Sequence, residues 1–275
     1  MSYAGLRVLA LESRRAMEIA KLIENNGGIA VVAPALREVP VEDNTEAFAF
    51  AERLEAGDFD MMIFLTGVGA RALDHVLATR FGEGFLQAEL KKLTVVARGP
   101  KPMAVLREWG VPVHVAVPEP NTWRELLVAI NGRTERRIAV QEYGKPNLEL
   151  YKVLEQRGAS VSAVRVYQWA LPKDVEPLRS AIRAVIAGEI DVMVLTTGVQ
   201  ATHLVEVAQR DGLADALRTA LGRIVVASIG PTASDTLEEL GIKPDMIPSH
   251  PKMGFLIKEA GEQAQQIRNR KSSSL

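Results

Sequence analysis

The chain contains two closely similar stretches of sequence. FDMMIFLTGVGA at residues 59–70 returns as IDVMVLTTGVQA at residues 190–201, which is 131 positions later. The same offset relates three further pairs and one aligned run: Gly27 and Gly158, Gly99-Pro100 and Gly230-Pro231, Gly110 and Gly241, and Arg7-Val-Leu-Ala10 with Ile138-Ala-Val-Gln141. A constant offset over separate segments indicates duplication of one architecture. We therefore expect two domains of similar fold.

Each copy alternates apolar runs with small-residue loops and helical patterns. Apolar runs at 6–11, 29–33, 61–65 and 93–97 predict buried strands, and periodic stretches at 16–23 and 45–56 predict helices. The strand at 61–65 runs into Thr66-Gly-Val-Gly69, and a helix follows through Leu77. Buried parallel strands that alternate with helices are typical of α/β proteins. The sequence predicts two similar three-layer domains with parallel sheets, a flavodoxin-like duplication.

Composition excludes several classes of function. The 275 residues carry 33 Lys and Arg against 34 Asp and Glu, so no overall charge attracts nucleic acid or an anionic membrane. The absence of cysteine excludes disulfides, thiolate nucleophiles and Cys-based metal sites. No apolar run reaches the roughly 20 residues that span a bilayer, and the N-terminus does not resemble a signal peptide. We expect a cytoplasmic protein with no membrane or nucleic-acid partner.

The strand-to-helix loops are the candidate binding positions, because ligands of open α/β sheets lie at the carboxyl ends of the strands. Each such loop points backbone N–H groups, at the positive end of a helix dipole, toward that edge and can hold a carboxylate or phosphate. Six loops qualify: 66–69, 98–101, 197–200, 228–232, 13–15 and 142–145. The alternative is that their glycines only permit tight turns and their threonines only cap helices.

Familiar catalytic signatures are missing from these loops. The chain has no phosphate-binding Gly-x-x-x-x-Gly-Lys motif, no Gly-x-Gly-x-x-Gly after the first strand and no Gly-x-Ser-x-Gly elbow. The four histidines are far apart and lack the spacing of metal ligands. Asp60 and Asp191 are repeat mates at strand starts, where we expect them to mark turns. We expect no metal and no cofactor.

Four segments together resemble the uroporphyrinogen-III synthase family. They are Phe64-Leu-Thr-Gly67, Val164-Arg-Val-Tyr-Gln168 with the linker 169–173, Leu195-Thr-Thr-Gly198, and Ser228-Ile-Gly-Pro-Thr-Ala233 with Leu237 and Gly241. The resemblance covers the chain to about residue 265, and its order and spacing fit the duplicated frame. The chain departs from the family's common pattern at Thr66-Gly67 and at Ser13-Arg14.

The resemblance implies exchanged segments and two linkers. One domain then combines residues 1–38 with 173–265, the other spans 41–170, and 266–275 form a flexible C-terminal tail. Pro40 and Pro172 mark the two crossings, since proline stiffens linkers.

The resemblance also implies an activity, a lyase reaction of tetrapyrrole and heme biosynthesis. The substrate would be hydroxymethylbilane, a linear tetrapyrrole with eight carboxylates, which is cyclised to uroporphyrinogen III with inversion of the last ring. We expect Tyr167 to be the catalytic proton donor, with Tyr143 in reserve, unless Tyr167 only packs the linker. A monomer is expected. The alternative function is a non-enzymatic two-domain binding protein for an anionic small molecule.

The expected substrate-binding residues are backbone donors, hydroxyls and cations at the candidate loops. They are Arg14, Thr66, Gly67, Arg98, Lys101, Tyr143, Lys145, Thr197, Gly198, Ser228, Gly230 and Thr232.

Overall fold

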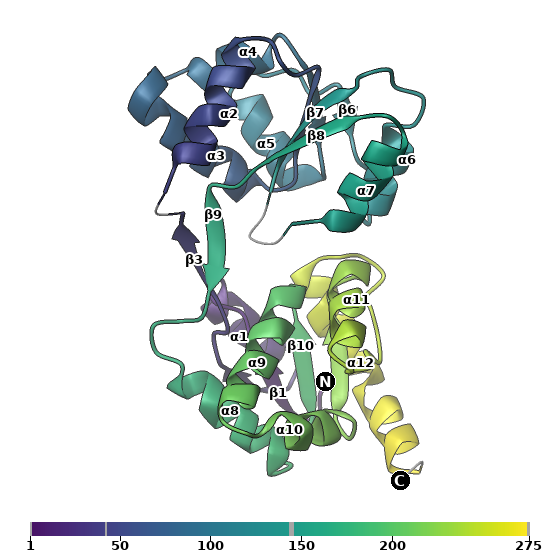
Figure 1. Ribbon diagram of the computed structural model, residues 1–275. Helices are drawn as coiled ribbons and strands as arrows, with labels where there is room; N and C mark the ends of the chain where they lie inside the picture. The colour runs from purple at the N-terminus through teal and green to yellow at the C-terminus, as the bar shows by residue number, and fades with distance from the viewer. Residues whose placement is uncertain (1, 42, 143–145, 274–275) are drawn as a thin grey trace. The chain divides into compact units, whose positions relative to one another are not determined.

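The computed structural model describes residues 2–41, 43–142 and 146–273. The chain divides into two compact units, and one of them is built from both ends of the sequence. Unit 1 comprises Met1–Arg37 and Ala170–Leu275, and unit 2 comprises Glu38–Trp169 (Figure 1). The sequence predicted crossings at 38–41 and at 170–173.

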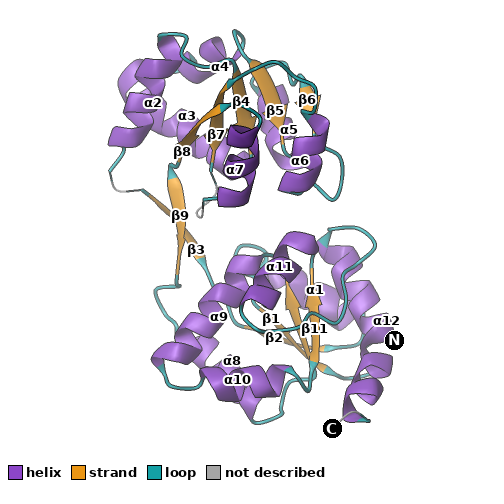
Figure 2. Ribbon diagram, turned by 45° about the vertical axis from the view of Figure 1, so that its right-hand side comes forward, coloured by secondary structure: helices purple, strands orange, loops and turns teal. Residues whose placement is uncertain are grey.

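Unit 1 holds a parallel four-stranded sheet between two helical layers (Figure 2). The strand order is β11 (Val225–Ser228), β10 (Val192–Leu195), β1 (Arg7–Ala10) and β2 (Ile29–Val32). One face is covered by α1 (Ala16–Asn25) and α12 (Met253–Ser272). The other is covered by α8 (Glu176–Ile186), α9 (Gly198–Arg210), α10 (Ala214–Leu221) and α11 (Pro231–Glu239).

Unit 2 repeats this arrangement around a five-stranded parallel sheet. The strand order is β6 (Val115–Ala116), β5 (Thr94–Ala97), β4 (Met61–Phe64), β7 (Arg137–Gln141) and β8 (Ser160–Val164). The first helical layer consists of α2 (Thr45–Glu55), α3 (Gly67–Phe81), α4 (Phe85–Leu90) and α5 (Pro100–Glu108). The second consists of α6 (Trp123–Ala129) and α7 (Leu148–Gln156).

Burial on both faces explains the apolar strand sequences. Every residue of β4 and of β10 is buried, because helices cover both sides of each sheet. The strand order β2, β1, β10, β11 of unit 1 is that of flavodoxin-like sheets, and unit 2 has the same spatial order from β8 to β5. The predicted α/β class with two three-layer parallel units is confirmed. The chain order of the strands reverses between β1 and β10 in unit 1 and between β4 and β7 in unit 2. The carboxyl ends of these strand pairs are therefore the expected ligand-binding points.

The strand register corrects one detail of the repeat. Met61 pairs with Ile138 in unit 2, whereas Val192, the repeat mate of Met61, pairs with Val8 in unit 1. The structural offset between β1 and β7 is therefore 130 positions, and the predicted match of Arg7 to Ile138 is wrong by one residue. The offset of 130 aligns Arg7 with Arg137, the charged first residue of each strand, so a comparison of these two residues would have shown the shift.

The two crossings are strands rather than plain linkers. β3 (Arg37–Pro40) pairs with β9 (Tyr167–Ala170) in a separate two-stranded sheet. The backbone N–H of Val41 also donates to the carbonyl of Val166 at 3.2 Å. The region around Pro40 was predicted to be a linker, and its pairing with β9 was not predicted.

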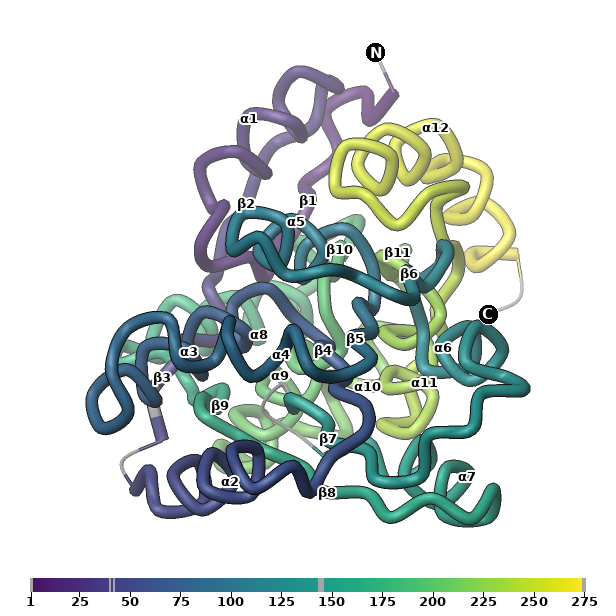
Figure 3. Tube along the Cα trace, turned by 90° about the horizontal axis from the view of Figure 1, so that it is seen from above, coloured from purple at the N-terminus to yellow at the C-terminus, as the bar shows by residue number. Residues whose placement is uncertain are grey.

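The end of the chain is not the flexible tail that was predicted from residue 266. Helix α12 continues to Ser272 and lies beside α1 (Figure 3). Ile267 is buried in the core of unit 1, and Arg268 pairs with Asp191 at 2.7 Å. The apolar residue keeps the last turns of the helix on the sheet because leaving would expose it to water.

Candidate functional site

The duplicated aspartates fix neighbouring strands at the end opposite the expected site. Asp60 accepts the backbone N–H groups of Arg136 and Arg137, at 3.3 and 3.0 Å. Asp191 accepts the backbone N–H of Arg7 at 2.8 Å in the same way. The guanidinium of Arg137 lowers the pKa of Asp60 to about 2. These acids therefore align two strand starts, which is a larger role than the turn marker we predicted.

At the carboxyl edge of unit 2, the loop after β4 packs tightly. Thr66 caps helix α3, since its Oγ1 accepts the backbone N–H of Gly69 at 3.0 Å. A Cβ at Gly67 would lie 2.8 Å from the carbonyl oxygen of Lys101, so only glycine lets these two loops meet. The structure thus brings together Thr66, Gly67 and Lys101, three of the predicted residues. Arg98, which lies in the same loop as Lys101, is half-buried.

Tyr167 lies against the same loop. Its hydroxyl is 3.0 Å from Thr66 Oγ1, and its side chain is 4% exposed. The ring packs in the main core of unit 2 and meets Trp169 edge-on, with ring centroids 6.4 Å apart. The predicted proton donor therefore sits at the strand edge, with most of its ring inside the fold.

Unit 1 repeats the geometry with different residues. Thr197 precedes α9, and a Cβ at Gly198 would lie 2.4 Å from Thr236 Oγ1 on α11. In unit 2 the corresponding Cβ at Gly67 would lie 3.3 Å from Cγ2 of Val105, which is the repeat mate of Thr236. Close approach of a helix start, Gly67 or Gly198, to the neighbouring helix is therefore a duplicated property of both edges.

The remaining predicted residues divide by exposure. Thr232, in the first turn of α11, and Arg14 are exposed, whereas Gly230 is buried. Ser228 is fully buried and its hydroxyl is 2.6 Å from that of Ser234, so the structure places this predicted ligand hydroxyl inside the unit. Tyr143 and Lys145 lie outside the described residues.

Two glutamates at these edges were missed. Glu12 follows β1 and accepts the Oγ1 hydroxyl of Thr196, while Glu142 follows β7, is 5% exposed and accepts the hydroxyl of Tyr151. They are repeat mates at the structural offset of 130 positions. Glu142 begins the predicted loop 142–145, but neither glutamate was given a role of its own, and only a repeat alignment with the one-residue shift could have paired them.

Backbone donors remain available in both units. The N–H groups of Thr66 and Gly69 are used internally, as are those of Thr196 and Thr197. In the described parts of the chain, four other N–H groups at the two helix starts have no acceptor: Gly67, Val68, Gly198 and Val199. Such pairs at helix starts suit carboxylate oxygens.

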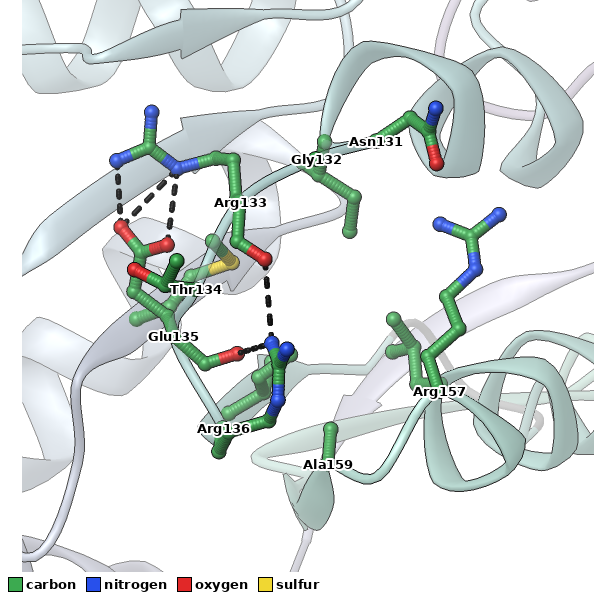
Figure 4. A pocket seen from close by; sticks show the side chains of 12 residues that line it. Asn131, Gly132, Arg133, Thr134, Glu135, Arg136, Arg157 and Ala159 are labelled. Atoms are coloured by element: carbon green, nitrogen blue, oxygen red, sulfur yellow. Dashed lines mark hydrogen bonds and ion pairs between the residues drawn. The ribbon is translucent and has the colours of Figure 1, made fainter.

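A cavity of about 310 Å³ lies elsewhere on unit 2 (Figure 4). Met61 and Ile138 line it, so it lies at the amino ends of β4 and β7, opposite the predicted loops. Arg133 pairs there with Glu135 and lowers the pKa of that carboxyl to about 2. Because Arg136 donates to the carbonyls of Arg133 and Glu135, its guanidinium stabilises the local chain. We do not assign the candidate site to this cavity.

Within residues 2–41, 43–142 and 146–273, no three His, Asp or Glu side chains are grouped so that they could hold a metal ion. None of the described helices is both long and apolar enough to cross a membrane.

Comparison with known proteins finds relatives of the same fold. The family model of uroporphyrinogen-III synthase HemD, HEM4, matches residues 17–258. The uncharacterized protein YjjA of Bacillus subtilis (strain 168) is 29% identical over 265 residues, which cover 93% of this chain and 94% of that protein. A mutant uroporphyrinogen III synthase of the extremely thermophilic bacterium Thermus thermophilus superposes with a TM-score of 0.69 and 27% identity, covering 98% of this chain and 100% of the other. A synthetase of Helicobacter pylori 26695, at 14% identity and a TM-score of 0.52 over 93% of this chain and 98% of the other, shows the same fold.

Proposed function

Because the chain belongs to the uroporphyrinogen-III synthase family, we propose that it cyclises hydroxymethylbilane to uroporphyrinogen III. The reaction closes the ring, inverts the last pyrrole and releases water, so the enzyme is a hydro-lyase. It needs no cofactor and works as a cytoplasmic monomer.

The substrate supplies most of the reactivity in this proposal. Loss of its hydroxyl as water leaves an electrophilic azafulvene, and the substituted carbon of the terminal pyrrole attacks it to give a spiro intermediate. Fragmentation and reclosure then place that ring in the inverted orientation. Without the enzyme, the open chain closes into the uninverted isomer. The protein must therefore select a conformation, which is catalysis by positioning.

The observation that carries the proposal is the pair of donor-bearing helix starts. Gly67 and Val68 in unit 2, and Gly198 and Val199 in unit 1, point backbone N–H groups without acceptors toward the carboxyl edges of their sheets. We propose that these groups bind carboxylates of the substrate, because the dipole of each helix favours negative charge at its start.

Cations and hydroxyls at the same edges complete the proposed site. Arg98 and Lys101 in unit 2, and Arg14 in unit 1, add positive charge that offsets the carboxylates. Thr232 is exposed at the start of α11 and can donate its hydroxyl. Tyr143 and Lys145 keep their proposed role in binding.

Tyr167 is the proposed proton donor to the leaving hydroxyl. Thr66 Oγ1 already accepts the N–H of Gly69, so its own hydrogen can point to the Tyr167 oxygen, 3.0 Å away. The phenol then accepts in this contact and does not use its own proton there. A positioned acid of this kind accelerates a reaction about 10²- to 10⁴-fold.

Incubation with freshly prepared hydroxymethylbilane tests the proposal. After oxidation, chromatography of the porphyrins should show isomer III formed faster than the spontaneous product. Formation of isomer I alone, at the rate without protein, would reject the enzymatic function. If the protein also bound the tetrapyrrole in that case, a non-enzymatic binding protein would be the better description.

A further inference from the structure

Both units place a glutamine side chain at the point where the strand order reverses. In unit 2 this glutamine belongs to strand β7, whereas in unit 1 it belongs to helix α9. In unit 2, Gln141 at the end of β7 is fully buried, and its Oε1 accepts the backbone N–H of Thr66 at 3.2 Å. In unit 1, Gln200 on α9 is 1% exposed, and its Oε1 accepts the N–H groups of Thr196 and Thr197 at 2.8 and 3.3 Å. The carboxamides therefore serve corresponding loops.

The two glutamines are not repeat mates. Gln200 corresponds to Gly69 at the offset of 131 positions, and Gln141 corresponds to Leu11 at the offset of 130 that the register gives. Each unit thus contains one glutamine and one residue without a carboxamide at these two positions. Unit 2 combines Gly69 with Gln141, and unit 1 combines Gln200 with Leu11.

Steric exclusion explains why the pair is exchanged as a whole. A Cβ at Gly69 would lie 1.9 Å from Nε2 of Gln141, so a larger residue at this point of α3 would push the Gln141 carboxamide out of its place beside the Thr66 N–H. In unit 1, Leu11 at the corresponding strand position is fully buried and has no polar group. The carboxamide of Gln200 then comes from the helix and also donates to Thr196 Oγ1 at 2.9 Å.

We propose that Gln141 and Gln200 are positioning residues that give the two edges the same donor pattern. The Gln141 carboxamide accepts the N–H of Thr66, the residue before α3, and the Gln200 carboxamide accepts that of Thr197, the residue before α9. The next two backbone N–H groups of each helix are thereby left for ligand. Gln141 also fixes the backbone of the residue whose side chain meets the Tyr167 hydroxyl. The proposal rests on the proposed function for its catalytic part, since those N–H groups bind substrate there.

A transplant of the unit 1 arrangement into unit 2 tests this. The variants are Gln141→Leu, Gly69→Gln and the double variant Gly69→Gln with Gln141→Leu. We expect kcat/KM to fall about 10-fold in Gln141→Leu, which leaves a backbone N–H without its partner. It should fall further in Gly69→Gln, where two side chains compete for one space, and return to within about 3-fold of wild type in the double variant.

Three further readouts separate positioning from simple stability. The fraction of isomer III at saturating substrate should fall in Gln141→Leu and recover in the double variant. Gln87→Leu, which removes a half-buried glutamine elsewhere in unit 2, should alter the melting temperature without altering that fraction. The melting temperatures of the three test variants should show the same order of damage and rescue.

The outcomes are distinguishable. A double variant no better than Gly69→Gln in both melting temperature and activity would overturn the proposal. Rescue of stability without rescue of the isomer ratio would overturn the catalytic part. If wild-type protein makes no isomer III, the proposed function fails, while the stability series still tests the exchange of the glutamine.

Discussion

Replacing Tyr167 by Phe removes one hydroxyl and little else. The side chain is 4% exposed and packs in the core, so the ring should keep its place. The lost hydrogen bond to Thr66 is a neutral one of 3.0 Å, and such bonds contribute about 1 kcal/mol to stability. Thr66 Oγ1 still accepts the N–H of Gly69, whereas its own hydroxyl hydrogen loses the Tyr167 oxygen as its acceptor.

The expected kinetic effect is larger than this loss of stability. If the phenol donates the proton to the leaving hydroxyl, kcat should fall about 100-fold, the lower end for a general acid. That corresponds to about 2.7 kcal/mol in the activation free energy. KM should change less than 3-fold, roughly, because the proposed carboxylate donors stay in place. The assay is the initial rate of isomer III formation, corrected for the spontaneous isomer I.

Tyr3→Phe is the matched control. Tyr3 is also a buried tyrosine, and its hydroxyl donates to the carbonyl of Ile257 at 2.8 Å in unit 1; it lies beside Gly28 at the amino end of β2, away from the carboxyl ends of the strands. This variant should lose about 1 kcal/mol of stability and no activity. A Tyr167→Phe enzyme that keeps kcat within about 3-fold of wild type would refute the acid role and leave Tyr167 as a packing residue.

Three other predictions concern charge and the chain end. Arg137 lowers the pKa of Asp60 from 3.8 to about 2, so this pair stabilises the fold fully above pH 3.8 and stops doing so as the pH falls through about 2. In Asp60→Asn, the free energy of unfolding measured in urea should therefore rise less steeply with pH between about 2 and 3.8 than in the wild type. An equal slope in the two proteins would contradict the pairing. Arg98→Gln and Lys101→Gln should each raise KM about 3- to 10-fold with little change in kcat, as steady-state kinetics would show; an unaltered KM would remove the residue from the site. Deleting residues 267–275 should cost about 2 kcal/mol or more, because Ile267 is buried; thermal melting equal to that of the full chain would restore the flexible-tail interpretation.

The fold could be predicted because the packing of helices on both faces of each sheet determines the residue types of the strands and of the loops that follow them. A parallel strand covered on both faces must be apolar at every position, as in Met61–Phe64 and Val192–Leu195. The small residues after each strand follow from the close approach of neighbouring helix starts, as at Gly67 and Gly198. Each constraint fixes the residue type at single positions of the chain, apolar in the strands and glycine at the helix starts, so the sequence shows it without knowledge of which segments are in contact.

The features that were missed depend on contacts between distant segments. β3 and β9 are short strands that pair with each other although they are more than a hundred positions apart in the chain. The shifted register of β1 is fixed by the pairing of Val8 with Val192 and of Met61 with Ile138, although the match of Arg7 to Arg137 at the offset of 130 already indicated it in the sequence. Gln141 reaches Thr66 only because β7 lies beside β4, and Glu142 looks like an ordinary loop acid until Tyr151 is placed against it.

Backbone amide spectra during a titration with uroporphyrinogen III test the central claim most directly. If amides at the carboxyl edges bind the carboxylates, the ¹⁵N–¹H signals of Gly67 and Val68 should shift together with those of Gly198 and Val199. Signals at the amino edge of unit 2, around Arg133 and Arg136, should stay in place. Shifts confined to that amino edge, with the four helix-start amides unmoved, would contradict the account.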